Sequence, residues 1–373
     1  MDEPSAVLEA VHNLADFESL ARERLEQPAF DYLAGGAGDE VTLAENGAAW
    51  RRWRLRPRVL RDVSHVDTAS RLLGSPVGLP LGLAPVAFQQ LAHPDAEVAG
   101  ARAASAAGVL YCLSTMSSRS LEDVATAADA AGDGPRWFQL YVHRDRGRSA
   151  ELVTRAAAAG YRAIVLTADF PVAGLRERDA RNRLPYPQAY GNFELPGPSD
   201  GREGVLPVVV GGLNDAALAW ADLAWLRRLT ALPVVVKGVL TGEDAALAIE
   251  HGAAAVWVSN HGGRQLDRTA ATADVLAEVV DAVSGRAEVY ADGGIRRGAD
   301  VLTALALGAR AVFVGRPAVF ALAAAGQAGV SRALELIGRE LSTDMALLGV
   351  TRVDELGLEH LLGAGQARRY TGS

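Results

Sequence analysis

The chain has 373 residues, of which 49% are hydrophobic and 22% charged, a composition typical of a globular enzyme. Its net charge of -8 gives no electrostatic footprint for nucleic acid, and its one cysteine, Cys112, excludes an intrachain disulfide. The acidic start lacks a signal core and no apolar stretch is long enough to span a bilayer, so we expect a cytoplasmic protein without nucleic-acid or membrane partners.

The first 80 residues precede the regular part of the chain. They begin with two predicted helices, Phe17–Glu26 and Pro28–Ala34, and end in a short segment rich in arginine and valine. Alone they cannot form a sizeable core, so we expect them to pack on the remainder as an N-terminal helical extension.

From residue 81 onward, short β-type runs alternate with Ala/Leu-rich helical stretches. Most of the runs are continuously apolar, as expected of parallel strands covered on both faces. The predicted strands are Leu81–Ala84, Val109–Leu113, Trp137–Tyr141, Ala163–Thr167, Pro233–Lys237, Ala254–Ser259, Glu288–Ala291 and Ala311–Gly315. The predicted helices between them include Ala96–Ala107, Ser120–Ala131, Arg148–Ala159, Glu243–His251 and Arg297–Leu307.

Eight strand–helix units predict the α/β class and a (β/α)₈ TIM barrel. An open doubly wound sheet is the alternative, but it usually carries a GxGxxG turn after its first strand, and the run at 81–87 has none. We predict one domain over 1–373, with the extension at 1–80, the barrel core at 81–325 and C-terminal helices at 326–373.

A long loop is predicted after the fourth strand. Residues 176–215 are the longest stretch without periodicity and are rich in Pro, Gly, Asn and Asp. A loop of this length is usually an active-site lid or a disordered insertion. Its polar composition does not resemble a membrane-binding segment.

Barrel enzymes place their active sites at the carboxyl ends of the strands, and here nearly every strand ends in a polar side chain or a glycine. Lys237, at the end of the fifth strand, is the only lysine among 37 basic residues. A position that kept lysine in so arginine-rich a chain is expected to need a compact ammonium group rather than a guanidinium fork.

The seventh and eighth strands predict a phosphate grip. They end in Asp292-Gly293-Gly294-Ile295-Arg296 and in Gly315-Arg316. Glycines free backbone N–H groups and arginines add charge, as at many barrel phosphate sites, although the glycines alone could simply make tight turns.

His261 lies at a strand end between Asn260 and two glycines, which let a ligand approach closely. An imidazole can act as a base near neutral pH. Arg264 and Arg176 suit bidentate pairing with a substrate carboxylate. Taken alone, however, Arg176 lies in a charged stretch and would be interpreted as a solvated surface residue. We predict no metal site.

At these residues the sequence resembles the FMN-dependent 2-hydroxy-acid oxidases and dehydrogenases, which include glycolate oxidase, lactate oxidase and mandelate dehydrogenase. The run Ser259-Asn260-His261-Gly262-Gly263-Arg264-Gln265 is the most specific part of the likeness. The other matching runs are Phe30-Asp31-Tyr32, Ala44-Glu45-Asn46, His93-Pro94, Phe138-Gln139-Leu140-Tyr141, Val236-Lys237-Gly238, Asp292-Gly293-Gly294-Ile295-Arg296-Arg297-Gly298 and Phe313-Val314-Gly315-Arg316-Pro317.

The resemblance implies a role for each residue of the reaction centre. His261 corresponds to the base that takes a proton from the substrate, and Asp169 to the carboxylate that orients it. The resemblance assigns the carboxylate clamps and the two substrate-contacting phenols to Arg176, Arg264, Tyr32 and Tyr141.

The resemblance also implies FMN as cofactor. Lys237 corresponds to the lysine near flavin N1 and O2. The resemblance assigns the remaining FMN contacts to Pro85, Val86 and Ala87 beside N5, to Ser114, Gln139, Thr167 and Ser259 on the ring, to Asp292 on the ribityl chain, and to Gly293, Gly294, Arg296, Gly315 and Arg316 at the phosphate end.

Departures from the family pattern bear on the substrate. Met116 stands where glycolate oxidase has a tryptophan, which opens room for an aryl side chain such as that of mandelate or 4-hydroxymandelate. Phe170 adds aromatic surface, whereas Val86 replaces a common threonine. A small Ala87 resembles the oxidases, whose acceptor is O₂ and whose product is hydrogen peroxide.

Other functions stay open at this stage. Glycolate or lactate oxidation, or a dehydrogenase with another electron acceptor, fits the same motifs. An FMN-dependent isomerase or a phosphate-binding aldolase would keep the phosphate grip, but would not need two arginines and two tyrosines around a histidine. A flavin-binding protein without turnover would not need His261 and Asp169. The resemblance further implies a homo-oligomer, a tetramer or an octamer.

Overall fold

The computed structural model describes residues 7–183, 190–193 and 213–362. Eight parallel strands close into a barrel in the order β10-β11-β4-β5-β6-β7-β8-β9. The strands are β4 (Leu81–Leu83), β5 (Leu110–Leu113), β6 (Arg136–Leu140), β7 (Ile164–Thr167), β8 (Val234–Val239), β9 (Ala255–Val258), β10 (Glu288–Ala291) and β11 (Ala311–Val314). The predicted (β/α)₈ barrel is confirmed, and every predicted strand lies within two residues of the observed one.

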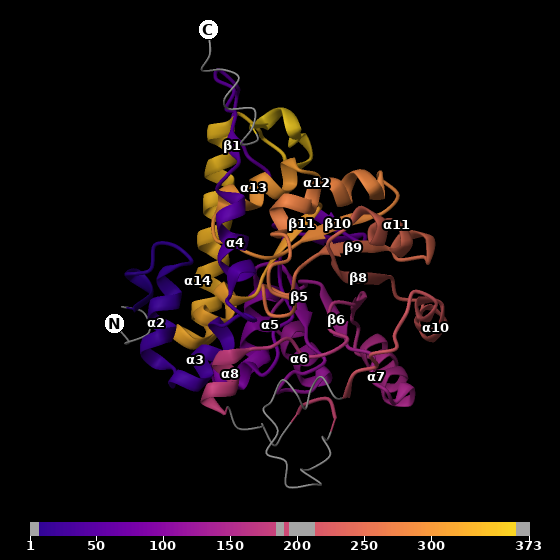
Figure 1. Cartoon of the computed structure of the whole chain (residues 1–373). Helices are drawn as coiled ribbons and strands as arrows, with labels where there is room; N and C mark the ends of the chain where they lie inside the picture. The colour runs from indigo at the N-terminus through magenta and orange to yellow at the C-terminus, as the bar shows by residue number, and fades with distance from the viewer. Residues whose placement is uncertain (1–6, 184–189, 194–212, 363–373) are drawn as a thin grey trace.

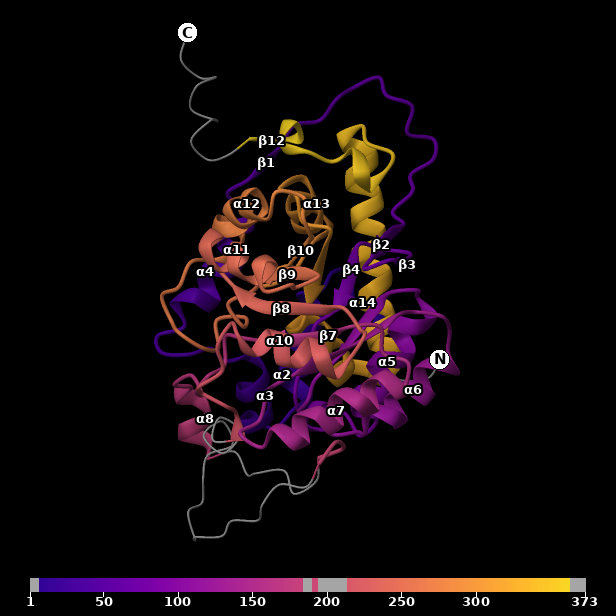
Figure 2. The ribbon, with the colours of Figure 1, turned by 90° about the vertical axis from the view of Figure 1, so that its right-hand side faces the viewer.

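Helices surround the barrel on its outer side (Figures 1 and 2). Those that follow the first six strands are α5 (Ala96–Ala106), α6 (Leu121–Asp129), α7 (Arg146–Ala158), α10 (Asp222–Leu229), α11 (Gly242–Glu250) and α12 (Thr272–Val283). The last two are α13 (Gly298–Ala306) and α14 (Arg316–Leu348). Helix α14 is broken at Ala325 and Gly326, whose backbone angles are not helical.

The barrel interior is a packed core. Trp257 stacks on Phe313 with ring centroids 3.8 Å apart, and Trp137 packs against Phe313 at 5.9 Å. Cys112 is fully buried among them, as expected of a small hydrophobe, and burial raises the pKa of its thiol. The hairpin β2 (Ser70–Leu72) and β3 (Ser75–Val77) contributes Leu72 and Val77 to this core.

The N-terminal extension packs on the barrel. Helix α2 (Asp16–Arg24) and helix α3 (Gln27–Ala34) lie beside α14, where Phe30 stacks on Phe320 with ring centroids 5.8 Å apart (Figure 1). Helix α4 (Val41–Trp50) contacts α12. The end of this part, for which the sequence predicted only a short Arg/Val-rich segment, forms β1 (Arg54–Leu55), β2 and β3.

Strand β1 pairs antiparallel with β12 (Leu361–Leu362), which joins the N-terminal extension to the end of the described chain. The prediction of C-terminal helices was therefore partly wrong: beyond α14, residues 350–362 form two short 3₁₀ turns and β12, and residues 363–373 lie outside the described part. Within the described ranges, none of the helices combines the length and apolar character needed to cross a membrane.

The long connection after β7 is partly helical, which corrects the expectation of an irregular stretch from 176. Helix α8 (Glu177–Asn182) packs on α3. Arg178 pairs with Glu40, and the Asn182 amide donates to Asp31 at 2.8 Å. These contacts come from the N-terminal extension, so the local composition could not reveal them. Residues 184–189 and 194–212 of the predicted loop lie outside the described residues.

Candidate active site

The carboxyl ends of the strands surround a cavity with an empty volume of about 1140 Å³, including its open mouth. Of the predicted site residues, those on its walls are Tyr32, Pro85, Val86, Ala87, Ser114, Met116, Gln139, Tyr141, Thr167, Arg176, Lys237, His261, Arg264, Asp292, Gly293, Gly294, Arg296, Gly315 and Arg316. Asp169 and Ser259 are the two that do not line it, because both lie behind residues that do. The structure thus brings together groups that are up to 284 residues apart, from Tyr32 to Arg316.

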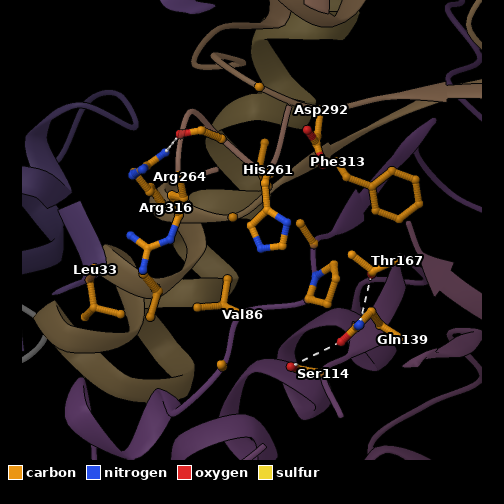
Figure 3. Close-up of a pocket in the computed structure, with 18 of the residues that line it drawn as sticks. Leu33, Val86, Ser114, Gln139, Thr167, His261, Arg264, Asp292, Phe313 and Arg316 are labelled. Carbon is orange, nitrogen blue, oxygen red and sulfur yellow. Dashed lines mark hydrogen bonds between the residues drawn. The ribbon is translucent and has the colours of Figure 1, made fainter. Parts of the chain in front are cut away.

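His261 projects into the middle of the cavity (Figure 3). Its backbone φ of 56° is left-handed, as are those of the two glycines that follow, so the chain turns sharply after β9. The His261 N–H donates to the Ser259 hydroxyl at 3.1 Å, which holds this unfavourable conformation.

Asp169 lies behind His261, with its Oδ1 2.9 Å from His261 Nδ1. A carboxylate there fixes the tautomer with the proton on Nδ1, so Nε2 is the ring nitrogen that can accept a proton. The Tyr141 hydroxyl is 3.4 Å from that Nε2. Gly238 makes room for Asp169, since a β-carbon on Gly238 would approach the Asp169 β-carbon to 2.5 Å.

The electrostatics of this pair favour a neutral base beside a charged carboxylate. Burial lowers the pKa of His261, and the charge of Asp169 only partly offsets that effect. Burial alone would raise the pKa of Asp169, but the electrostatic interactions with His261 and Lys237, together with the hydrogen bonds that the carboxylate accepts, lower that pKa. His261 is therefore a proton acceptor at neutral pH, with a negative charge ready to stabilise its protonated form.

Two arginines converge beside the histidine. Burial and the nearby charge of Arg264 lower the pKa of Arg176 to about 10. Arg264 lies over the ring of Tyr32, 5.0 Å from its centroid, and Arg176 lies 5.9 Å from the centroid of Phe170. The Asp179 carboxylate, 4.0 Å from Arg176, partly balances the two guanidinium groups, and a substrate carboxylate between them would further relieve their repulsion, so they form a site for an anion.

A chain of neutral hydrogen bonds forms one wall of the cavity (Figure 3). Ser114 Oγ donates to Gln139 Oε1 at 3.3 Å, and Gln139 Nε2 donates to Thr167 Oγ1 at 2.9 Å. The ends of three adjacent strands, β5, β6 and β7, are joined in this way. The arrangement offers a row of uncharged donors and acceptors to the edge of a planar heterocycle.

Lys237 is 4% exposed and is the fourth of the six residues of β8. Its ammonium group donates to Ser259 Oγ at 2.8 Å, lies 3.7 Å from Asp292 Oδ2, and is 5.6 Å from the centroid of the Trp257 ring. Ser259 therefore supports Lys237 and His261 from behind, and its contact with the cofactor stays a prediction.

At the opposite end, β10 and β11 present glycines and two arginines. Gly294 has a φ of 87°, and a β-carbon there would lie 2.2 Å from the Asn46 carbonyl oxygen, so glycine is needed for α4 to approach. Gly315 precedes the N-terminus of α14, which favours a bound anion. Burial lowers the pKa of Arg296.

Arg316 makes contacts that the sequence does not reveal. Its guanidinium donates to the carbonyl oxygens of Ala34 at 3.1 Å, Gly262 at 2.9 Å and Gly35 at 2.8 Å. It thus joins α3 to the loop after β9. This end of the cavity is therefore lined by two arginines, Arg296 and Arg316, and by the glycines at 294 and 315.

These residues fit FMN. Asp292 Oδ1 is buried and has no hydrogen-bond partner within the described residues, although it lines the cavity. An orphaned buried acceptor of this kind suits a polyol hydroxyl. The cavity then offers a cationic end for a phosphate, an acceptor for the ribityl chain, and the wall of Ser114, Gln139 and Thr167 for the ring.

Sequence reasoning missed several apolar lining residues. They are Leu33, Ala84, Phe88, Ile295, Phe313, Val314 and Val319. Phe88 is the most consequential, because its ring centroid lies 6.0 Å from that of Tyr32. Phe88 could have been found from the sequence, because it directly follows the predicted lining run from Pro85 to Ala87. Its left-handed φ of 56°, which turns the chain there, could not be read from the sequence.

A barrel with a phosphate-binding rim, a histidine–aspartate pair and an arginine-lined anion site defines an oxidoreductase of the flavin-dependent barrel class. A family model for FMN-dependent dehydrogenases matches residues 21–362. The chain belongs to this FMN-dependent dehydrogenase family, and FMN is its cofactor.

Similar proteins cover nearly the whole chain. An L-lactate oxidase from Nostoc sp. is 49% identical over 94% of this chain and 97% of its own, and glycolate oxidase from Spinacia oleracea is 47% identical over 94% and 95%. A crystal structure of mandelate oxidase with (S)-4-hydroxymandelic acid superimposes with a TM-score of 0.88 at 45% identity, covering 94% of this chain and 98% of the other.

Proposed function

We propose that the protein oxidises an (S)-2-hydroxy acid to the 2-oxo acid, with O₂ as electron acceptor and hydrogen peroxide as product. The observation that carries the proposal is the placing of His261 Nε2 in the cavity, with Asp169 behind its Nδ1 and two arginines beside it. A base next to an anion site is what an acidic substrate with a removable proton requires.

The protein groups have distinct tasks in this reaction. Arg264 and Arg176 hold the substrate carboxylate, and the phenols of Tyr32 and Tyr141 contact the carboxylate and hydroxyl. His261 Nε2 takes a proton from the substrate, and Asp169 stabilises the resulting imidazolium. Bound FMN supplies a two-electron acceptor, which O₂ later reoxidises. Lys237 places a positive charge where negative charge develops.

For the substrate we propose an aryl 2-hydroxy acid, mandelate or 4-hydroxymandelate, which makes the enzyme an (S)-2-hydroxy-acid oxidase of the 4-hydroxymandelate oxidase type. Met116 and Phe88 line the cavity, and so does Phe170, whose ring centroid is 5.1 Å from that of Tyr141 and 5.7 Å from that of His261. Aromatic and thioether surface of this kind favours a phenyl group.

Smaller substrates are the competing possibility, because the L-lactate oxidase and the glycolate oxidase are 49% and 47% identical to this chain. The experiment is anaerobic addition of mandelate, 4-hydroxymandelate, lactate and glycolate to the yellow holoenzyme, with flavin bleaching followed over time. We expect the two aryl acids to bleach FMN fastest. Faster bleaching by lactate or glycolate would refute the aryl assignment, and absence of bleaching by all four would refute the reaction.

A variant of Met116 tests directly whether this part of the cavity accommodates the phenyl group. Met116→Trp should slow bleaching by mandelate while sparing lactate, because an indole in this buried position fills the space for the ring.

Admission of air after bleaching identifies the acceptor. An oxidase turns yellow again and releases peroxide, whereas a dehydrogenase stays bleached until an artificial acceptor is added.

We also propose a single-domain subunit, with extension and C-terminal segment packed on one barrel, that assembles into a homotetramer or homo-octamer in the cytoplasm. Light scattering on the purified holoenzyme tests the assembly. A monomeric mass at micromolar concentration would contradict it.

A further inference from the structure

The short segment Tyr190–Phe193, between β7 and β8, docks on the loop that follows β5. Asn192 is 4% exposed and makes three hydrogen bonds there. Its Nδ2 donates to the Thr115 carbonyl at 3.0 Å and to Ser117 Oγ at 2.9 Å, while its Oδ1 accepts the Leu121 N–H at 2.9 Å. One buried amide thus forms hydrogen bonds with the residues on both sides of Met116.

The backbone of the segment completes this contact. The Gly191 N–H donates to the Ser117 carbonyl at 3.0 Å. A β-carbon on Gly191 would lie 1.9 Å from the Arg119 carbonyl carbon, so only glycine permits this approach. The same loop is held from its other side by Glu97, which accepts the N–H groups of Ser118 at 2.9 Å and Arg119 at 3.2 Å.

Met116 is 1% exposed and has little freedom inside this clamp. Its N–H donates to Ser114 Oγ at 3.1 Å, and its carbonyl accepts the Phe88 N–H at 3.1 Å. The Phe88 ring lies between those of Tyr32 and Tyr190, with centroids 6.0 and 5.2 Å away. A shift of the Thr115–Ser117 backbone would therefore move Met116 and Phe88 together.

We propose that Asn192 is a positioning residue for the substrate side chain, which sets the Met116–Phe88 wall of the cavity from outside it. This inference rests on the proposed oxidation of aryl 2-hydroxy acids. Asn192 lies away from the histidine–aspartate pair and from the lining of the cavity, so it acts on the fit of the side chain rather than on proton transfer. A small substrate such as lactate does not reach the wall and is indifferent to its position.

The variant Asn192→Asp isolates the donor end of the amide. Its carboxylate still accepts the Leu121 N–H but cannot donate to Thr115 and Ser117. The matched control is Tyr161→Phe, since the buried Tyr161 hydroxyl donates to the Leu121 carbonyl at 2.9 Å and does not contact residues 115–117. Both variants thus remove buried hydrogen bonds near the start of α6. Ser117→Ala is a second variant, which removes one of the two acceptors of the Asn192 amide together with the bond from the Ser117 hydroxyl to the Arg119 carbonyl at 2.7 Å.

The measurement is kcat/KM for mandelate divided by kcat/KM for lactate, together with the Kd of phenylacetate from the change in the FMN spectrum. We expect Asn192→Asp to lower the ratio about tenfold and to weaken phenylacetate binding similarly, the scale of one or two lost buried hydrogen bonds. FMN content and lactate turnover should stay within about twofold of wild type. Ser117→Ala should give a smaller shift in the same direction, and Tyr161→Phe none.

An unchanged ratio in Asn192→Asp, or equal losses on both substrates, would overturn the inference. If Asn192→Asp does not fold, an unchanged ratio in Ser117→Ala has the same force. A wild-type enzyme that prefers lactate would instead overturn the aryl assignment itself, and that result is visible before any variant is made.

Discussion

Arg264 and Arg316 donate to the same acceptor, the carbonyl oxygen of Gly35, each at 2.8 Å. Arg264 Nη1 also donates to the Tyr32 carbonyl at 2.7 Å. The end of α3 is therefore tied to the loop after β9 and to the start of α14. Because both of these bonds use Nη1, they leave the other nitrogens of Arg264 on the side of the Tyr32 ring and the cavity. The N-terminal extension thus helps to build the anion site.

Arg264→Lys should raise KM for the 2-hydroxy acid by about ten- to hundredfold, the scale of a lost charge-assisted hydrogen bond. One ammonium group cannot bridge two carbonyls and also clamp a carboxylate. Steady-state kinetics provide the measurement. Arg268→Lys, at a mostly exposed arginine paired with Asp39, is the control and should behave as wild type. An unaltered KM in Arg264→Lys would show that Arg264 does not bind the substrate carboxylate.

His261→Ala should retain FMN but slow its anaerobic reduction by about 10²–10⁴-fold, as expected for loss of an acid–base group. Rapid mixing with substrate measures the rate of flavin bleaching. His251→Ala, at a histidine stacked on Trp220 outside the cavity, is the control. Reduction at a near-normal rate in His261→Ala would show that another group takes the proton.

Asp169→Asn should slow reduction and also move the acid limb of the pH profile to lower pH. The charge of Asp169 raises the pKa of His261 against the larger lowering effect of burial. Removing that charge lowers the pKa of His261 further, so the base stays unprotonated to lower pH although it is a weaker base. The pH dependence of kcat/KM measures the shift. An acid limb that moves upward would contradict the assigned interaction.

Lys237→Arg should weaken FMN binding although it conserves charge. The ammonium group is enclosed by Ser259, Asp292 and the Trp257 ring, and a larger guanidinium in a packed site costs about 1–3 kcal/mol. We expect the Kd of FMN to rise about five- to 150-fold by that conversion. Fluorescence titration of the apoprotein measures it, with Lys237→Met as a comparison of similar bulk without charge. Wild-type affinity in Lys237→Arg would make the lone lysine incidental.

The strands could be located from the sequence because each is a short apolar run between helical stretches, and such patterns are local. The rim residues followed, since a closed barrel brings all strand ends to one side. Helix α8 was missed because its contacts come from α3, and the hydrogen bonds of Ser259 and Arg316 could not be predicted because side-chain direction depends on distant carbonyls and on Lys237. The left-handed turn at Phe88 was invisible for the same reason.

The burial of Cys112 and Lys237 has a practical consequence for covalent labelling. They are the chain's only thiol and only side-chain amine, at 0% and 4% exposure, and both lie on barrel strands. In the folded protein an alkylating or acylating reagent therefore finds no accessible cysteine or lysine. Mass tags should appear on these two residues only when the barrel opens. The labelling rate therefore measures the rate of barrel opening without any engineered probe.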